Sequence, residues 1–534
     1  MKLTGAYGCS EHMAVLLRRG DQLRFLIFSA IGFVFFFFLF TKREHIPTPI
    51  DKVRSWQKPV QQDLPVPVNH NTDGFALDAG DGGNYASEEV PSSPSSLPHT
   101  NYLASTEEET TIPSTSLASD PSVSVSAHAY GFTVFDKLYL RNGTFFVVTK
   151  DVKSMPPRGR ILSKGGLEEL SDEPATDEDL QFISPSQAKE YLGEFATVVK
   201  DTSVIISDPA QFLGHYYHFW GEVVIGAWRV YSTLGLGVLG LDHLPLPSRW
   251  IMPFLNDDSG WRDQAGINGP LMRLAFPGSA MEEAGQWRDW KKSGITVVFE
   301  RSMIVNRVSA HKSPLGSVWP KMISGTMNVT APTGFWEPLR SALTRNLFGY
   351  VPEVKPDGKP LVPPFKGNSV SKPIVTYISR QRTGRRLTDE SHQGLVAALR
   401  ELEEEGICTV RIPILENLSL RDQLAEVASS TILVGVHGNG LTHQLWMPPS
   451  LRSAVFEIVM PPGYIFDYEI LARNMGHKHY MVRNDSMLTF APGDWFRGFD
   501  VPEGFHGDQI PVQGPFVADL IRKRLTQPDA EVKA

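Results

Sequence analysis

The last third of the chain alternates short apolar runs with amphipathic segments. Apolar runs at residues 374–379, 408–415, 431–436, 454–459 and 479–482 predict buried strands. Leu395, Leu399 and Leu402 mark one face of a helix that ends near Gly406, and residues 420–427 and 467–474 predict two more helices. Alternating strands and helices indicate a parallel sheet, which binds ligands at the carboxyl ends of its strands.

The preceding segment, residues 128–370, has a less regular pattern. Strands are predicted at residues 132–135, 197–206 and 295–305, and a helix at residues 218–234. Proline and glycine at residues 352–367 predict a flexible connection to the second half. We therefore predict the fold class α/β, with two α/β domains (128–370, and 371–534, which ends in a helix) that face a ligand cleft.

One apolar run near the N-terminus predicts a membrane anchor. Residues 25–41 are 17 uncharged, phenylalanine-rich residues between Arg24 and Lys42, enough for about 25 Å of helix. The run is longer than the core of a signal peptide and lacks a small-residue cleavage site, which favours a retained transmembrane signal anchor over a cleaved peptide. Residues 1–24 are then a cytosolic tail. Residues 42–127, rich in Pro, Ser, Thr and acids, are predicted to be a disordered stalk.

Basic residues flank the anchor equally on both sides, so charge does not orient it. Four N-glycosylation sequons do, because all of them follow the anchor: Asn142, Asn328, Asn417 and Asn484. They predict a single-pass type II protein of the Golgi or endoplasmic reticulum membrane with a lumenal domain. The only cysteines, Cys9 and Cys408, then lie on opposite sides of the membrane, which excludes a disulfide framework. A formal charge of −8 argues against nucleic acid as a partner.

Two motifs follow predicted strands. Residues 434–441 (VGVHGNGL) end a strand with His437 and two glycines, Gly438 and Gly440, which let backbone N–H groups approach a phosphate; a tight turn with a packed histidine is the alternative. Residues 379–386 (SRQRTGRR) carry four arginines that suit a diphosphate, with Arg380 expected to point inward; the alternative is a solvated basic loop.

A third motif, residues 214–222 (GHYYHFWGE), places His218 and Glu222 one helical turn apart, where a carboxylate orients an imidazole or acts as a base itself. An aromatic core helix, or a metal site that includes His215, are the alternatives. Three other features are set aside: the glycines at 235–240 follow a helix rather than a strand, the acidic residues 177–179 belong to a surface loop, and Cys408 is expected to be buried.

The SRQRTGRR block, the block VGVHGNGLTHQLWMPP and the following VFEI strand resemble glycosyltransferase family 61, across most of residues 127–484. This family contains plant xylosyl- and arabinosyltransferases and animal lumenal O-GlcNAc transferases. The resemblance implies a type II membrane protein with a GT-B-like fold of two Rossmann-like domains. Residues 128–370 are then the acceptor-side domain and residues 371–534 the nucleotide-sugar-binding domain. It further implies an inverting transfer that uses a UDP-sugar and needs no metal or other cofactor.

The resemblance also implies residue roles. Donor binding is expected at Arg380, Arg385, Arg386, His437, Gly438, Asn439 and Gly440, with Glu457 meeting the ribose hydroxyls. His218 matches the histidine of the family's H-x-x-x-D block, in which Glu222 replaces the usual aspartate, and either residue is a candidate base. The predicted function is transfer of xylose or GlcNAc from a UDP-sugar to a glycan or glycoprotein hydroxyl. The alternatives are a non-catalytic lumenal sugar- or nucleotide-binding protein, and a metal hydrolase.

Overall fold

The computed structural model describes residues 117, 120–164, 173–236, 240–241, 244–255, 260–361, 371–491, 493–494 and 498–527. They form two β-sheets with surrounding helices, which confirms the α/β class. The predicted tail, the anchor and most of the stalk lie outside these residues. In the described part of the chain, no helix has both the length and the apolar character required to cross a bilayer.

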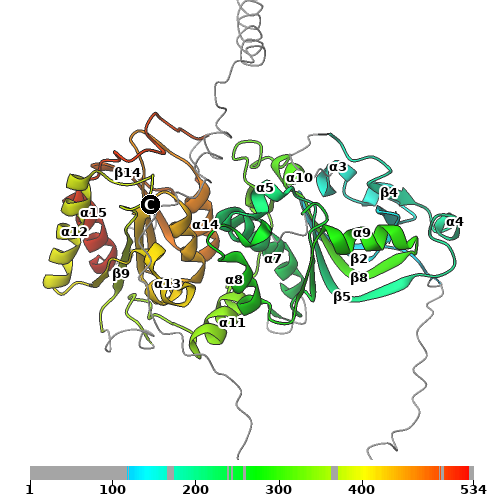
Figure 1. The fold of residues 1–534 in the computed structure, drawn as a ribbon, viewed down its shortest axis with the longest axis horizontal. Helices are drawn as coiled ribbons and strands as arrows, with labels where there is room; N and C mark the ends of the chain where they lie inside the picture. The colour runs from blue at the N-terminus through cyan, green and yellow to red at the C-terminus, as the bar shows by residue number, and fades with distance from the viewer. Residues whose placement is uncertain are drawn as a thin grey trace, which may run out of the picture. The chain divides into compact units, whose positions relative to one another are not determined.

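The first sheet has eight strands in the order β4-β3-β2-β8-β5-β6-β7, with β1 paired to β2 (Figure 1). The strands are β1 (Ser124–Ala129), β2 (Phe132–Arg141), β3 (Thr144–Val148), β4 (Leu180–Ile183), β5 (Thr197–Ile206), β6 (Arg249–Ile251), β7 (Ala280–Glu282) and β8 (Val297–Val305). Strands β8, β5, β6 and β7 are parallel, and β2 is antiparallel to β8. The order of these parallel strands reverses between β5 and β8, the position at which doubly wound sheets bind ligands.

The helices of this half are α3 (Arg158–Ile161), α4 (Ala188–Leu192), α5 (Ala210–Leu213), α6 (Tyr216–His218), α7 (Ile225–Tyr231), α8 (Asn268–Ala275), α9 (Ala284–Ser293), α10 (Arg307–His311) and α11 (Glu337–Phe348). A π-helical turn, η2 (Phe219–Val224), joins α6 to α7. The helix predicted at residues 218–234 is therefore present, but it begins two residues earlier and has a wider turn at its centre.

The second sheet has six strands in the order β10-β9-β11-β12-β13-β14. The strands are β9 (Ile374–Ile378), β10 (Thr409–Arg411), β11 (Ile432–Val436), β12 (Ala454–Ile458), β13 (Lys478–Arg483) and β14 (Ser486–Leu488). The first five are parallel, and β14 is antiparallel to β13. Here the strand order reverses between β9 and β11, so the loops that leave these two strands border the expected ligand position.

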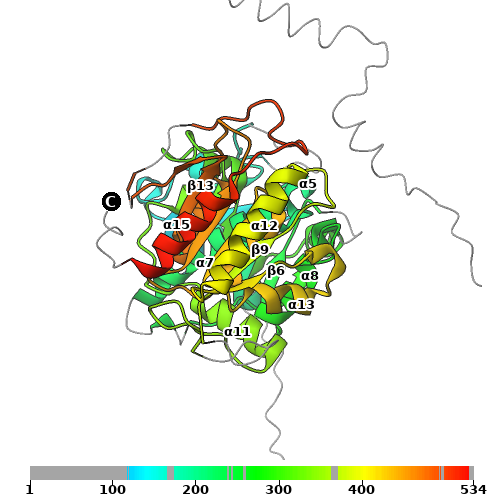
Figure 2. The same cartoon turned by 90° about the vertical axis from the view of Figure 1, so that its left-hand side faces the viewer.

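Helices α12 (Asp389–Glu404) and α15 (Gly514–Thr526) pack side by side and cover one face of this sheet, in front of β9 and β13 in Figure 2. Helices α13 (Leu420–Val427) and α14 (Asp467–Met475) and the 3-10 helix η8 (Asn439–Trp446) complete this half. The predicted apolar stripe of α12 is buried, and the side chain of Thr388 caps its first turn by accepting from Ser391 N–H. The strands and helices predicted for this half are thus present.

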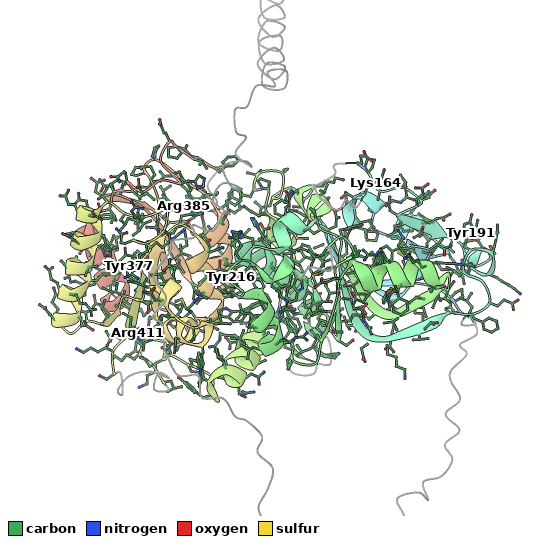
Figure 3. The ribbon with its side chains drawn as sticks, viewed as in Figure 1. Lys164, Tyr191, Tyr216, Tyr377, Arg385 and Arg411 are labelled. Carbon is green, nitrogen blue, oxygen red and sulfur yellow. The ribbon has the colours of Figure 1, made fainter. Side chains whose placement is uncertain are left out.

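A continuous apolar core joins the two halves. At the junction, Trp446 Nε1 donates to Tyr216 Oη (3.0 Å) and Trp336 Nε1 donates to the Leu445 carbonyl (2.8 Å). The Trp220 and Trp446 rings lie 5.2 Å apart in a T-shaped arrangement. Figure 3 labels Tyr216 at this junction. Because this packing is tight, η8 has a defined position relative to α6.

The structure corrects several predicted boundaries. Residues 124–127, assigned to the stalk, belong to β1, which pairs with β2. The strand predicted at 408–415 is limited to Thr409–Arg411. Strands β3, β4, β6 and β7 were not predicted, because they are short or pair with distant segments. Cys408 is buried as predicted, and burial raises the pKa of its thiol to about 12.

Candidate functional site

A buried ion cluster lies at the strand-order reversal of the first sheet. Ile206 of β5 pairs with Val305 of β8, so the residues that follow, Asp208 and Arg307, leave the sheet side by side. Arg307 Nε donates to Asp208 Oδ2 (2.9 Å), and Arg307 Nη1 donates to Glu222 Oε2. One guanidinium therefore holds two carboxylates that come from different elements.

His218 completes this cluster. Its Nδ1 lies 3.1 Å from Glu222 Oε2, so the predicted contact across one helical turn is present. The Glu222 side chain is fully buried, whereas that of His218 is 23% exposed. Since an ionised carboxylate only accepts hydrogen bonds, Nδ1 carries a proton, and in the neutral imidazole Nε2 is then the acceptor nitrogen. The pair thus presents a free imidazole nitrogen, with Glu222 behind it.

Burial and the two counter-charges act in opposite directions on these groups. Burial favours the neutral form of Glu222, but the Arg307 and His218 charges outweigh it and lower the pKa of Glu222. Burial raises the pKa of Asp208 to about 6, against the opposing pull of Arg307. Glu222 is therefore a stable carboxylate at neutral pH, and a weak base.

The loops at the strand-order reversal of the second sheet bring two arginines to one carbonyl. Arg380 Nη1 and Arg385 Nη1 both donate to the His437 carbonyl, at 2.6 and 2.9 Å. Arg385 is labelled in Figure 3, on the loop that follows β9. In the described part of the chain neither arginine is paired with a carboxylate. Burial lowers the pKa of both, and the nearby Arg380 charge further lowers that of Arg385. Two arginines without a carboxylate ion pair therefore converge on the same loop, and Arg385 Nη2 also contacts His506 Nδ1.

Gly438 allows this convergence. Its φ is +146°, and a Cβ built there would lie 1.7 Å from Arg380 Nη1. Glycine is required both by the backbone conformation and by the close approach of the guanidinium. Gly440 lies in the first turn of η8, where a Cβ would meet Ile378 at 3.1 Å. The first N–H groups of a helix lack partners within it, so they add to the positive character of this loop.

Asn439 connects the two strand-end clusters. Its Oδ1 accepts from the Tyr217 N–H (3.3 Å), and its Nδ2 lies 3.3 Å from His215 Nε2. The His215 and His218 ring centroids are 4.9 Å apart. The loop that carries the arginine-binding carbonyl therefore contacts the segment that carries His218.

His437 itself is packed rather than open. Its ring lies 5.1 Å from Tyr468 and 5.2 Å from Phe505, and it is only 6% exposed. Its Nδ1 contacts Glu457 Oε1. From the sequence, His437 could either face a ligand or be packed. In the structure its side chain is packed, and its main-chain carbonyl accepts hydrogen bonds from Arg380 and Arg385.

Two residues of the expected donor set contact other protein groups in this structure. Glu457 is fully buried, and its two oxygens contact His437 Nδ1 and His479 Nε2 (2.8 Å), so no oxygen is available to ribose hydroxyls. Burial raises the pKa of Glu457 well above its usual range. Arg386 turns away to Asp508 Oδ2 (2.7 Å) on the surface, and so it holds a loop instead of joining Arg380 and Arg385.

The remaining predictions fall on the surface or outside the site. Asn142, Asn328 and Asn417 are exposed, whereas Asn484 is half-buried and follows β13. Asp177 and Glu178 are exposed in a turn, as expected of a surface loop. Gly235 lies in a 3-10 turn after α7, and residues 237–239 are outside the described part. Among the described residues, no three His, Cys, Asp or Glu side chains are arranged to hold a metal ion.

Sequence reasoning missed four residues that shape the site: Asp208, Arg307, Lys321 and His479. Asp208 and Arg307 each follow an apolar strand by two residues, in VIISDP and MIVNR. The strand-end reasoning that selected Arg380 applies equally to them, so a signal was present. Lys321 and His479 have no such signal, since only the folding of distant segments places them here.

A comparison with known families identifies the class of protein. Residues 216–454 match the family model Glycosyltransferase 61. This segment contains His218, Glu222, Arg307, Arg380 and His437. The protein is therefore a glycosyltransferase, and this part of its chain is similar to family 61. No curated protein matches the sequence.

Proposed function

We propose that the protein is an inverting, metal-independent glycosyltransferase that moves a sugar from a UDP-sugar to a glycan or glycoprotein hydroxyl. The supporting observation is the contact of Asn439 with Tyr217 and His215, which brings the segment that carries His218 next to the arginine loop. Both groups lie at strand-order reversals, where ligands bind. We propose further that the two halves form a GT-B-like pair of Rossmann-like domains.

The arginine loop is the proposed diphosphate site. Arg380 and Arg385 supply forked donors. The 3-10 helix η8 begins in the same loop, directly after Gly438, so its first N–H groups are further candidate donors. As the glycosidic bond to the diphosphate breaks, negative charge develops on the leaving oxygen. These donors stabilise that charge.

His218 is the proposed base, with Glu222 as its positioning residue. Glu222 is buried and held by Arg307, and its lowered pKa makes it a poor proton acceptor. His218 is partly exposed, and its Nε2 is free. In the proposed step the acceptor oxygen attacks the anomeric carbon opposite the diphosphate, His218 Nε2 takes the hydroxyl proton, and UDP leaves with the bonding electrons.

Several finer proposals rest on the family resemblance and the sequons. They are xylose or GlcNAc as the donor sugar, and a single-pass type II anchor in the Golgi or endoplasmic reticulum membrane with the catalytic domain in the lumen. Three of the four sequon asparagines, Asn142, Asn328 and Asn417, are exposed and accessible to a glycan, which supports a lumenal domain. Treating the full-length protein from cells with a glycosidase should increase its gel mobility if these sites are used.

The donor site is tested by UDP binding. UDP at about 100 times its dissociation constant should stabilise the full chain by about 2.7 kcal/mol, seen as a higher melting temperature. Arg380→Ala should remove this stabilisation because it deletes a charged donor to the diphosphate. Arg382→Ala, on the same loop but with an exposed side chain, is the control and should keep it.

UDP-xylose, UDP-GlcNAc and GDP, each with and without EDTA, extend the same measurement. Stabilisation by UDP and by one UDP-sugar in the presence of EDTA supports the proposal and identifies the donor. A protein that no nucleotide stabilises would contradict the assignment of this loop. Loss of stabilisation on adding EDTA would contradict metal independence.

Gly438→Ala should weaken UDP binding by about 10- to 100-fold, the equivalent of one or more charged hydrogen bonds. The added methyl group occupies the position of Arg380 Nη1 and strains the backbone, so the guanidinium must move. Calorimetric titration with UDP measures the effect. Gly278→Ala is the control, since a Cβ there meets nothing within 4 Å. Equal UDP affinities for the two variants would show that UDP binding does not depend on this position of the Arg380 guanidinium.

A further inference from the structure

Lys321 forms an ion pair between the two halves at the centre of the site. It precedes the 3-10 helix η6 (Met322–Thr326), and its Nζ lies 3.0 Å from Oδ1 of Asp467, the first residue of α14. The side chains are only 16% and 11% exposed. Pairs this sheltered are screened less by salt than surface pairs are.

The surroundings of Lys321 belong to both proposed substrate sites. Its Nζ lies 5.5 Å from the centre of the Tyr217 ring. That ring is 5.3 Å from His218 on one side and 5.3 Å from Tyr468 on the other, and Tyr468 packs against His437. Lys321 therefore lies beside the aromatic rings that link the proposed base to the proposed diphosphate loop.

The electrostatics agree with this position. Burial lowers the pKa of His437, and the charges of Arg385, Lys321 and Arg380 lower it further. Burial also lowers the pKa of His215, to about 4, and Lys321 is among the charges that contribute. The ammonium group of Lys321 thus acts on the donor loop and on the segment that carries His218.

The pair is suited to exchange of partners. Lys321 Nζ is the one charged partner of Asp467 Oδ1 in the described part of the chain, and no other hydrogen bond to this oxygen is present there. Asp467 is the one carboxylate paired with Lys321 in the described part of the chain. A lysine ammonium is a compact charge on a flexible side chain and, unlike a guanidinium, has no planar set of donors. It can therefore exchange one anionic partner for another by rotating its side chain.

We propose that Lys321 is a third cation for the leaving diphosphate and that Asp467 holds it when the donor is absent. This inference rests on the proposed UDP-sugar site. On donor binding, Lys321 leaves Asp467 and contacts the diphosphate from the side opposite Arg380 and Arg385. Asp467 therefore competes with the donor for the same ammonium group.

This competition predicts opposite effects for the two partners. Removing the carboxylate of Asp467 should strengthen donor binding, and removing the ammonium group of Lys321 should weaken it. Asp467→Asn should bind UDP about 3- to 10-fold more tightly, and Lys321→Met about tenfold or more weakly. Lys321→Arg should retain most of the affinity. In the Lys321→Met background, Asp467→Asn should bring no gain, because no ammonium group is left to release.

Calorimetric titration of the full chain with UDP measures these affinities, and melting temperatures without ligand report on folding. The exposed pair of Lys359 and Asp357 is the control. Its nitrogen–oxygen distance is 2.9 Å, similar to that of the Lys321 pair, so Asp357→Asn removes a comparable carboxylate on the protein surface. A purely structural pair would lower both melting temperatures and leave the two UDP affinities equal, which would overturn the inference. Failure of the wild type to bind UDP would instead reject the proposed function on which it rests.

Discussion

Replacing His218 with glutamine or alanine is expected to lower the rate of sugar transfer by about 10²- to 10⁴-fold, the usual contribution of a general base. UDP affinity should stay the same, because the donor groups come from the loops after β9 and β11. The effect should appear in kcat, measured with the donor that the stabilisation assay identifies. Melting temperature should change little, since the imidazole is partly exposed.

His392→Ala is the matched control. This histidine also pairs through Nδ1, with Tyr377 Oη at 3.0 Å, but it lies on α12 outside the site. It should transfer sugar at the normal rate. Unimpaired turnover by both His218 variants would exclude His218 as the base and return the role to Glu222 or to another group.

Replacing Arg307 with leucine is expected to lower the free energy of unfolding by about 3 to 5 kcal/mol. The substitution leaves Asp208 and Glu222 in the interior without their counter-charge, and the ionised form of both then becomes costly. It also removes the guanidinium that lies 4.1 Å from the Phe212 ring centre. Denaturant or thermal unfolding measures the loss, and turnover should fall with it because Glu222 no longer holds His218.

Arg301→Leu, on strand β8 just before α10, provides the comparison. Arg301 of β8 pairs with Asp136 (2.7 Å), but both side chains are about one-third exposed, so the expected cost is about 0 to 1 kcal/mol. The loss of unfolding free energy for Arg307→Lys should lie between the losses for these two variants, because one ammonium group cannot bridge both carboxylates. Equal stability of the Arg307→Leu and Arg301→Leu variants would mean that the buried cluster does not hold the loops together.

Prediction from sequence worked best where neighbours in sequence are neighbours in space. The second sheet is built from successive βαβ units, so the apolar runs from Ile374 to Val482 correspond to its five parallel strands. In the first sheet, β2 pairs with β8 across more than 150 residues, and β6 and β7 are three residues each. Such pairings leave little periodic signal in the local sequence.

The sequence by itself determined the α/β class, the pairing of His218 with Glu222 across one helical turn, and the position of a group of arginines directly after the strand that ends at Ile378. These follow from local spacing, because residues four apart on a helix meet and a strand end exposes the residue after it. Only the tertiary structure decided that Arg307 holds Glu222, that Glu457 is buried between two histidines, that Arg386 turns away and that Lys321 reaches Asp467. Each of these contacts joins segments from different elements, and their approach depends on how the whole core packs rather than on any stretch of sequence.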